Sequence, residues 1–122
     1  MSDPTPAQPI DLGHLARYTG GARELNCEIF RLFSQQCVQA LVSLKADLKA
    51  GQSKGWRDTA HSLKGAASGI GAFGVAESAG MAESLNPQRD RAGAARVLTA
   101  LGTRCEVVLA FIQAYLAAEH QR

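Results

Sequence analysis

Residues 22–49 read ARELNCEIFRLFSQQCVQALVSLKADLK, and they carry the clearest helical pattern in the chain. Apolar side chains recur there at steps of three and four residues: Leu25, Ile29, Phe33, Cys37, Ala40, Leu41, Leu44 and Leu48. This spacing places them on one face of an α-helix, as an amphipathic helix with a buried face requires. Gly51 follows as a typical residue for ending such a helix. The stretch therefore predicts a long helix that contributes one face to a protein core.

Further helical segments flank this helix on both sides. Their predicted ranges are residues 10–17, 54–70, 73–85 and 90–119. No alternating apolar pattern typical of strands competes with them. We therefore predict an all-α fold: an antiparallel four-helix up-and-down bundle with a short additional N-terminal helix, over residues 10–119. Residues 1–9 are rich in proline and are expected to form a flexible leader, and residues 120–122 a tail.

Composition and charge exclude several classes of function. The chain has 122 residues, enough for one domain, with 13 Lys and Arg against 11 Asp and Glu, and it lacks a basic run that could follow a phosphate backbone. We expect no nucleic-acid partner. No uninterrupted apolar run approaches the ~20 residues that cross a membrane, and no signal segment is recognisable, so we expect no membrane partner and a cytoplasmic location. The three cysteines lack metal-site spacing and are expected to be buried.

His61 lies on a polar stripe of the helix predicted over residues 54–70. On a wheel of about 100° per residue, the apolar face lies about 180–260° from His61. That face holds Trp56, Ala60, Leu63, Ala67 and Ile70, whereas Arg57, Lys64, Gly65 and Ser68 lie within about 60° of the histidine. The histidine is therefore predicted to point into solvent rather than into the core.

Lys64 and Gly65 distinguish this histidine from an ordinary exposed one. Glycine inside a helix lowers the stability of the helix by about 1 kcal/mol relative to alanine. Helical glycines are therefore typical of places where another backbone or a ligand comes close. Lys64 lies on the next turn, where its ammonium can neutralise an anion attached to the imidazole. The pattern favours an open surface around one nucleophilic nitrogen and one cation.

The run from Ala60 to Ala72, AHSLKGAASGIGA, closely resembles the signature of histidine phosphotransfer (HPt) domains. In that family a histidine is followed by Leu-Lys-Gly and then by a second glycine, here Gly71. The likeness covers about residues 10–117, nearly the whole chain.

This resemblance implies a role for each residue near the histidine. His61 would accept a phosphoryl group on Nε2 and relay it to or from an aspartate of a response-regulator receiver domain in a two-component phosphorelay. Glu83, on the fourth helix of the bundle, would accept a hydrogen bond from Nδ1–H, and Lys64 would stabilise the phosphohistidine. No cofactor is expected on this chain, because the receiver would supply Mg²⁺. No nucleotide-binding motif occurs, so we expect no kinase activity of its own.

Partner-binding residues are expected around His61 and on the preceding helix. A receiver domain, or a sensor or hybrid histidine kinase, would pack over Gly65 and Ser68, with Arg57 beside them. Apolar residues exposed next to this stripe, Ile29 or Phe33, are expected to form the centre of the contact. We expect a small, transient interface and a monomeric chain.

Other functions fit the sequence less well. The main alternative is a helical interaction module that binds and inhibits a receiver or kinase without being phosphorylated, but such a module has no need of the histidine nucleophile. A metal or haem site is disfavoured because no Glu-x-x-His pair faces the predicted interior. Gly69, Gly71 and Gly74 match a dinucleotide fingerprint only in spacing, since they join two helices and follow no strand.

Overall fold

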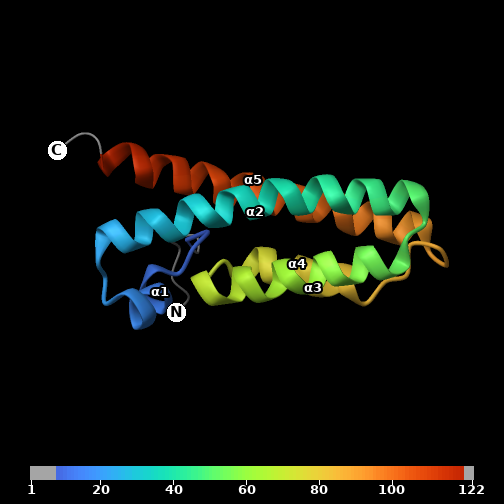
Figure 1. The fold of residues 1–122 in the computed structure, drawn as a ribbon, viewed down its shortest axis with the longest axis horizontal. Coiled ribbons are helices and arrows are strands. Elements are labelled where there is room, and N and C mark those ends of the chain that lie inside the picture. Colours follow the sequence, from blue (N-terminus) through green and yellow to red (C-terminus); the bar gives the residue numbers. More distant parts are fainter. Residues whose placement is uncertain (1–7, 120–122) are drawn as a thin grey trace, which may run out of the picture.

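The computed structural model describes residues 8–119, and it contains no strand in that range. Its helices are α1 (Leu12–Thr19), α2 (Arg23–Ala50), α3 (Ser53–Ile70), α4 (Phe73–Glu83) and α5 (Arg91–Glu119). Each of α2 to α5 packs against its neighbour in sequence, and α5 closes the ring on α2. Figure 1 shows α2 and α5 side by side above α3 and α4, with α1 at one end. The predicted all-α up-and-down bundle is confirmed.

Two helices differ from their predicted ranges by more than one residue. α1 begins later because the Asp11 side chain accepts a hydrogen bond from the backbone N–H of His14 at 3.0 Å, so Ile10 packs in the core ahead of the helix. α4 ends at Glu83 because the Leu85 N–H turns to the Ala82 carbonyl at 3.0 Å, in a tighter turn. Residues 1–7 of the predicted leader and the tail at 120–122 lie outside the described residues.

The core follows the apolar faces of the bundle helices. Its largest fully buried side chains include Trp56, Phe30, Ile10, Leu15, Leu44, Leu63, Leu101 and Ile112. All five residues of the predicted apolar face of α3 are buried, which confirms that prediction. All three cysteines are buried as expected, and the Cys37 thiol donates to Sγ of Cys105 at 3.4 Å.

The face that α2 turns to the core differs from the predicted one at its N-terminal end. Leu25 is exposed, whereas Phe30 is buried and packs edge-on against Phe111 and Tyr115 of α5. The prediction that Phe33 is exposed for partner binding is wrong, because Phe33 shares the core with Phe30 and is only 3% exposed. Aromatic partners on α5 therefore decide which apolar stripe of α2 is buried.

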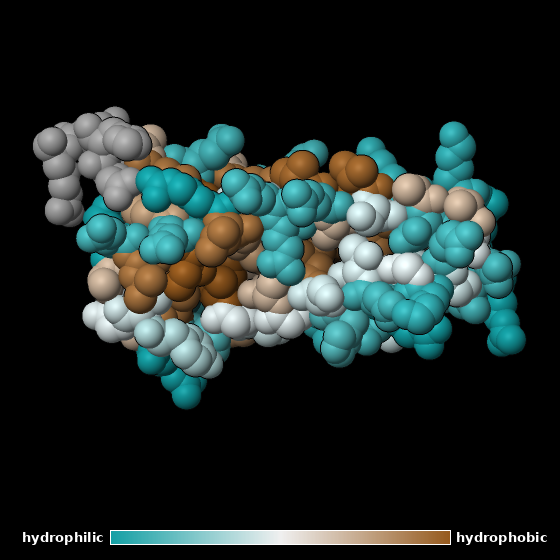
Figure 2. Space-filling model, viewed as in Figure 1, coloured by the Kyte–Doolittle hydropathy of each residue, from teal (hydrophilic) through white to brown (hydrophobic). Residues whose placement is uncertain are grey.

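α5 is long and apolar enough, by length and composition, to cross a membrane over Arg91–Ala118. A count of uninterrupted apolar runs misses this, because charged and polar residues interrupt the helix. The core helix of a soluble protein passes the same test, and the α5 residues Leu101, Cys105, Val108 and Ile112 are buried in the bundle. Figure 2 shows apolar surface gathered towards the α1 end, while the opposite end is mostly hydrophilic.

Candidate functional site

α3 presents its polar stripe to solvent, as the wheel predicts. The His61 side chain is 68% exposed. Arg57 and Gly65 are also exposed, and Lys64 and Ser68 are half-buried. A Cβ added to Gly65 would meet no neighbouring side chain or segment within 4 Å. This side of α3 is therefore open to an approaching molecule.

A carboxylate from α4 meets one nitrogen of the His61 ring. Nδ1 lies 2.8 Å from Oε2 of Glu83, the last residue of α4. An ionised carboxylate can only accept hydrogen bonds, so Nδ1 carries the proton of the neutral imidazole. Nε2 then keeps its lone pair, and within residues 8–119 no group forms a hydrogen bond to it.

Lys64 binds the other oxygen of the same carboxylate. Its Nζ lies 2.8 Å from Oε1 of Glu83. The aliphatic part of the side chain passes α4 at Gly80, where an added Cβ would stand 3.3 Å from Cδ of Lys64. Glycine at this position lets the side chain lie close to the α4 backbone. Glu83 thus bridges His61 and Lys64; the family resemblance led us to expect its bond to His61 but not its bond to Lys64.

Both bridge partners favour the ionised form of Glu83. The hydrogen bond from the Lys64 ammonium has the larger effect and the bond from His61 the smaller, and together they hold the pKa of the Glu83 carboxyl below its usual range. The carboxylate therefore stays charged at neutral pH and keeps the ring proton on Nδ1. A neutral imidazole with a fixed proton on one nitrogen and a lone pair on the other is a positioned nucleophile.

Comparisons with known families and structures cover most of the chain. The family model of the Hpt domain matches residues 28–118. The chain belongs to the Hpt domain family. Among solved structures, histidine-containing phosphotransfer protein B (HptB) from Pseudomonas aeruginosa PAO1 is similar, with 25% sequence identity and a TM-score of 0.71 over 89% of this chain and 95% of that chain. No curated protein matches the chain. Family membership gives this Hpt domain a histidine phosphotransfer role in phosphorelays.

Of the two apolar residues that the sequence singled out near α3, only Ile29 contributes to the surface of this Hpt domain. Phe33 is in the core, and Ile29 is half-buried and packs against it. Leu25 and Leu32 are exposed instead, Leu32 by 61%. They are spaced by two helical turns, a signal from which the sequence could have identified them.

The stripe of Leu25 and Leu32 continues towards α3. Gln36 and Gln39 follow it at helical spacing and line a shallow pocket of about 290 Å³ together with Asp58, Thr59 and Ser62 of α3. The exposed leucines of α2 therefore lie on the side of the bundle that borders α3.

Arg57 is not part of the bridge around Glu83. It is exposed one turn before His61, next to the ion pair of Lys54 Nζ and Asp58 Oδ2 at 2.6 Å. The Lys54 ammonium, as the larger cause, lowers the pKa of the Asp58 carboxyl. Across residues 8–119, no three His, Cys, Asp or Glu side chains gather in a way that could hold a metal ion.

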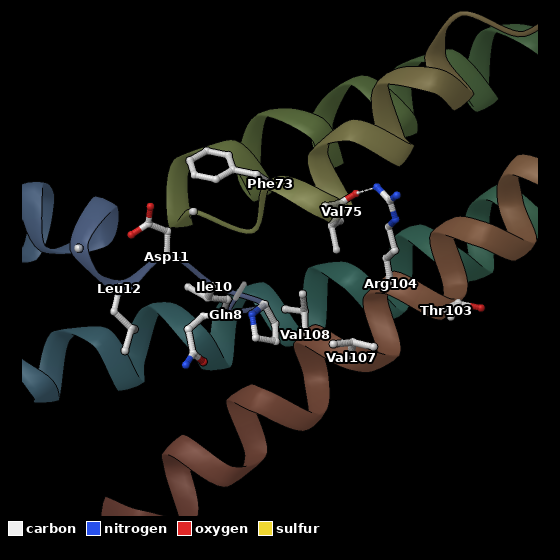
Figure 3. Close-up of a pocket in the computed structure, with 14 residues that line it drawn as sticks. Gln8, Ile10, Asp11, Leu12, Phe73, Val75, Thr103, Arg104, Val107 and Val108 are labelled. Carbon is white, nitrogen blue, oxygen red and sulfur yellow. Dashed lines mark hydrogen bonds between the residues drawn. The ribbon is translucent and has the colours of Figure 1, made fainter. Parts of the chain in front are cut away.

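A larger pocket of about 810 Å³ lies away from His61, between residues 8–13, the start of α4 and the middle of α5. Figure 3 shows Phe73, Val75 and Val108 among the apolar side chains around it. Arg104 at its edge donates to the Gly74 carbonyl at 2.8 Å and pairs with Glu77 at 2.7 Å. None of the residues that line this pocket belongs to the His61 site.

Proposed function

We propose that His61 is the phosphoacceptor of this Hpt domain. It takes a phosphoryl group from a receiver phosphoaspartate, or from a sensor or hybrid histidine kinase, and passes it to the next receiver, in the cytoplasm. The observation that carries the proposal is the bridge at Glu83, whose two oxygens each lie 2.8 Å from a donor, one from His61 Nδ1 and one from Lys64 Nζ. This bridge selects the tautomer in which Nε2 can attack.

The transfer step requires little chemistry from this chain. The lone pair of Nε2 forms a bond to phosphorus, while the bond from phosphorus to the aspartyl oxygen breaks and the carboxylate leaves with its electron pair. Such transfers pass through a loose transition state, so positioning and charge neutralisation supply most of the catalysis. Mg²⁺ and the acidic pocket belong to the receiver. This chain supplies the oriented imidazole.

Glu83 and Lys64 have different roles as charge develops. The imidazole becomes cationic when Nε2 binds phosphorus, and the Glu83 carboxylate at Nδ1–H stabilises that positive charge. In the resting state Lys64 pairs with Glu83 and lowers the pKa of its carboxyl. Its side chain is flexible and partly exposed, so its ammonium can also approach the phosphoryl oxygens once the group has been transferred.

The partner packs over the open side of α3 and the neighbouring stripe of α2. Gly65 and Ser68 leave room for a receiver loop, with Arg57 at the edge of the contact. Leu32 and the half-buried Ile29 supply the apolar centre in place of Phe33. Such a small contact forms and dissociates readily, as required of a monomeric carrier that must bind one partner after another.

The test is transfer of radioactive phosphate from a phosphorylated receiver. We expect an acid-labile, alkali-stable label on the wild-type chain and on His14→Gln, and none on His61→Gln. The His61→Gln variant keeps its melting temperature, because the side chain lies outside the core. A label that persists in His61→Gln contradicts the assignment. Tight receiver binding with no label on the wild type would favour the inhibitory interaction module.

A further inference from the structure

Trp56 lies on the opposite side of α3 from the open surface, yet it binds the end of α4 that carries Glu83. Its side chain is fully buried. The indole Nε1–H donates to the backbone carbonyl of Ala82 at 2.7 Å. Ala82 is itself fully buried, so water does not replace this donor. The accepting carbonyl belongs to the peptide group that joins Ala82 to Glu83.

The C-terminal end of α4 differs from the ends of the three helices before it. α1, α2 and α3 each end at a glycine in the left-handed conformation, with φ of 64°, 69° and 85° at Gly20, Gly51 and Gly71. α4 ends instead at Ser84, with φ of −77°. It lacks the glycine cap of the other helices; its last turn is closed by the Ser84 N–H, which donates to the Gly80 carbonyl at 3.3 Å, and by the Leu85 N–H, which donates to the Ala82 carbonyl at 3.0 Å. The Trp56 indole adds a second donor to the Ala82 carbonyl, and this donor ties the end of α4 to another helix.

α3 thus holds residues 82–83 from two sides. Trp56 binds the Ala82 carbonyl from the core, and His61 and Lys64 bind the Glu83 carboxylate from the surface. All three donors belong to one helix, α3. The orientation of the peptide group at Ala82 sets where the Glu83 side chain begins, and a carboxylate that must meet two donors at once tolerates little displacement.

We infer that Trp56 is a positioning residue for the proposed phosphotransfer, which acts by orienting the Ala82 peptide so that Glu83 reaches Nδ1 of His61. This inference rests on the proposed role of Glu83 and His61. Loss of the indole N–H, with the ring retained, allows the end of α4 to move. The fraction of the His61 ring with its proton on Nδ1 then falls, and phosphorylation slows several-fold.

The chain contains one tryptophan, so an analogue supplied in its place changes position 56 only. Benzothienylalanine has nearly the shape of tryptophan but carries sulfur in place of the N–H group. Fluorotryptophan keeps the N–H group and serves as the matched control. Nitrogen NMR of the unphosphorylated protein measures the tautomer fraction of His61 in both. This readout does not depend on phosphotransfer, so a failure of the proposed function and a failure of this inference are distinguishable.

We expect the fluorotryptophan protein to keep the wild-type tautomer fraction and the benzothienylalanine protein to lose part of it. Trp56→Phe, which can be made genetically, should also lower the fraction of His61 rings that carry the proton on Nδ1. Phe30→Leu weakens the core between α2 and α5 and controls for general destabilisation. It should leave the tautomer fraction of His61 unchanged. Equal tautomer fractions in the two analogue proteins would overturn the inference. An equal shift in Phe30→Leu would overturn it as well.

Discussion

The two halves of the bundle are held together by side chains of different size. Between α2 and α5 the core contains large residues, with Phe30 edge-on to Phe111 and Tyr115. α3 and α4 contribute many alanines to the core, Ala60, Ala67, Ala76, Ala79 and Ala82, beside the larger Trp56, Leu63, Ile70 and Val75. α3 and α4 nevertheless make the most extensive contact of any helix pair, although α4 has only 11 residues.

This difference in side-chain size suggests that the α2–α5 contact mainly stabilises the fold, whereas the α3–α4 contact mainly sets the geometry of the His61 site. Removing a large buried side chain exposes more apolar area, and therefore costs more hydrophobic stabilisation, than removing an alanine methyl group. Small side chains let the backbones of α3 and α4 approach, so that short polar contacts can cross between them. Trp56 reaches the Ala82 carbonyl, and Lys64 passes Gly80 to reach Glu83.

The largest effect is expected from removing an aromatic ring in the half with large side chains. Phe33→Ala should lower the free energy of unfolding by about 3–5 kcal/mol, because it leaves a cavity in a packed core. Urea denaturation measures the loss. In the fraction that stays folded, the His61 tautomer should be unchanged, because the α3–α4 contact is intact. Wild-type stability together with weakened receiver binding would restore Phe33 as a partner residue.

A smaller effect, on binding alone, is expected at the exposed stripe of α2. Leu32→Asp should weaken receiver binding roughly tenfold, about 1.4 kcal/mol, because it places a charge in the apolar centre of the proposed contact. Val38→Asp is the matched control: Val38 is 52% exposed and lies about 120° around the same helix. Titration calorimetry compares the two. Equal losses of affinity in both variants would mean that the receiver does not dock on the stripe that borders α3.

Glu83 should affect rate rather than folding. Glu83→Ala frees the imidazole to rotate and to change tautomer, so phosphorylation should slow by about tenfold, whereas Glu83→Gln should keep much of the rate because its amide oxygen still accepts from Nδ1–H. Both variants should melt close to the wild type, because the carboxylate is at the surface. Single-turnover transfer from a phosphorylated receiver gives the rates. Equal rates for alanine and glutamine would contradict the orienting role.

How far the sequence predicts this molecule depends on how local each signal is. The apolar period of α3 is regular, so the wheel places Trp56 in the core and His61 outside it. In α2 the adjacent apolar residues Phe30, Leu32 and Phe33 allow more than one buried stripe, and only their partners on α5 decide between them. The pairing of Glu83 with His61 is implied by the family resemblance rather than by spacing.

A helical wheel describes the faces of a single helix and therefore does not predict contacts between helices. The bond of Lys64 to Glu83 depends on Gly80, which lies on a different helix from Lys64, and on how closely α3 and α4 approach. α4 ends early because the Leu85 N–H bonds to the Ala82 carbonyl, and no glycine at this helix end predicts that turn from the sequence. Each requires the tertiary arrangement to be known.

The smallest effect is in the titration of Glu83, and it tests which donor controls the carboxylate. Its pKa in the folded chain lies below the ordinary value, with Lys64 the larger cause and His61 the smaller. The bridge therefore stabilises the folded chain above the ordinary glutamate pKa of about 4.3, and this contribution is lost as the pH falls through the lower folded value. Carbon NMR of the Glu83 carboxyl should give a higher midpoint in both Lys64→Met and His61→Ala, with the larger rise in Lys64→Met. A larger rise in His61→Ala would mean that the imidazole, and not the ammonium, has the larger effect on the pKa of Glu83, which would contradict the leading role of the Lys64 bond.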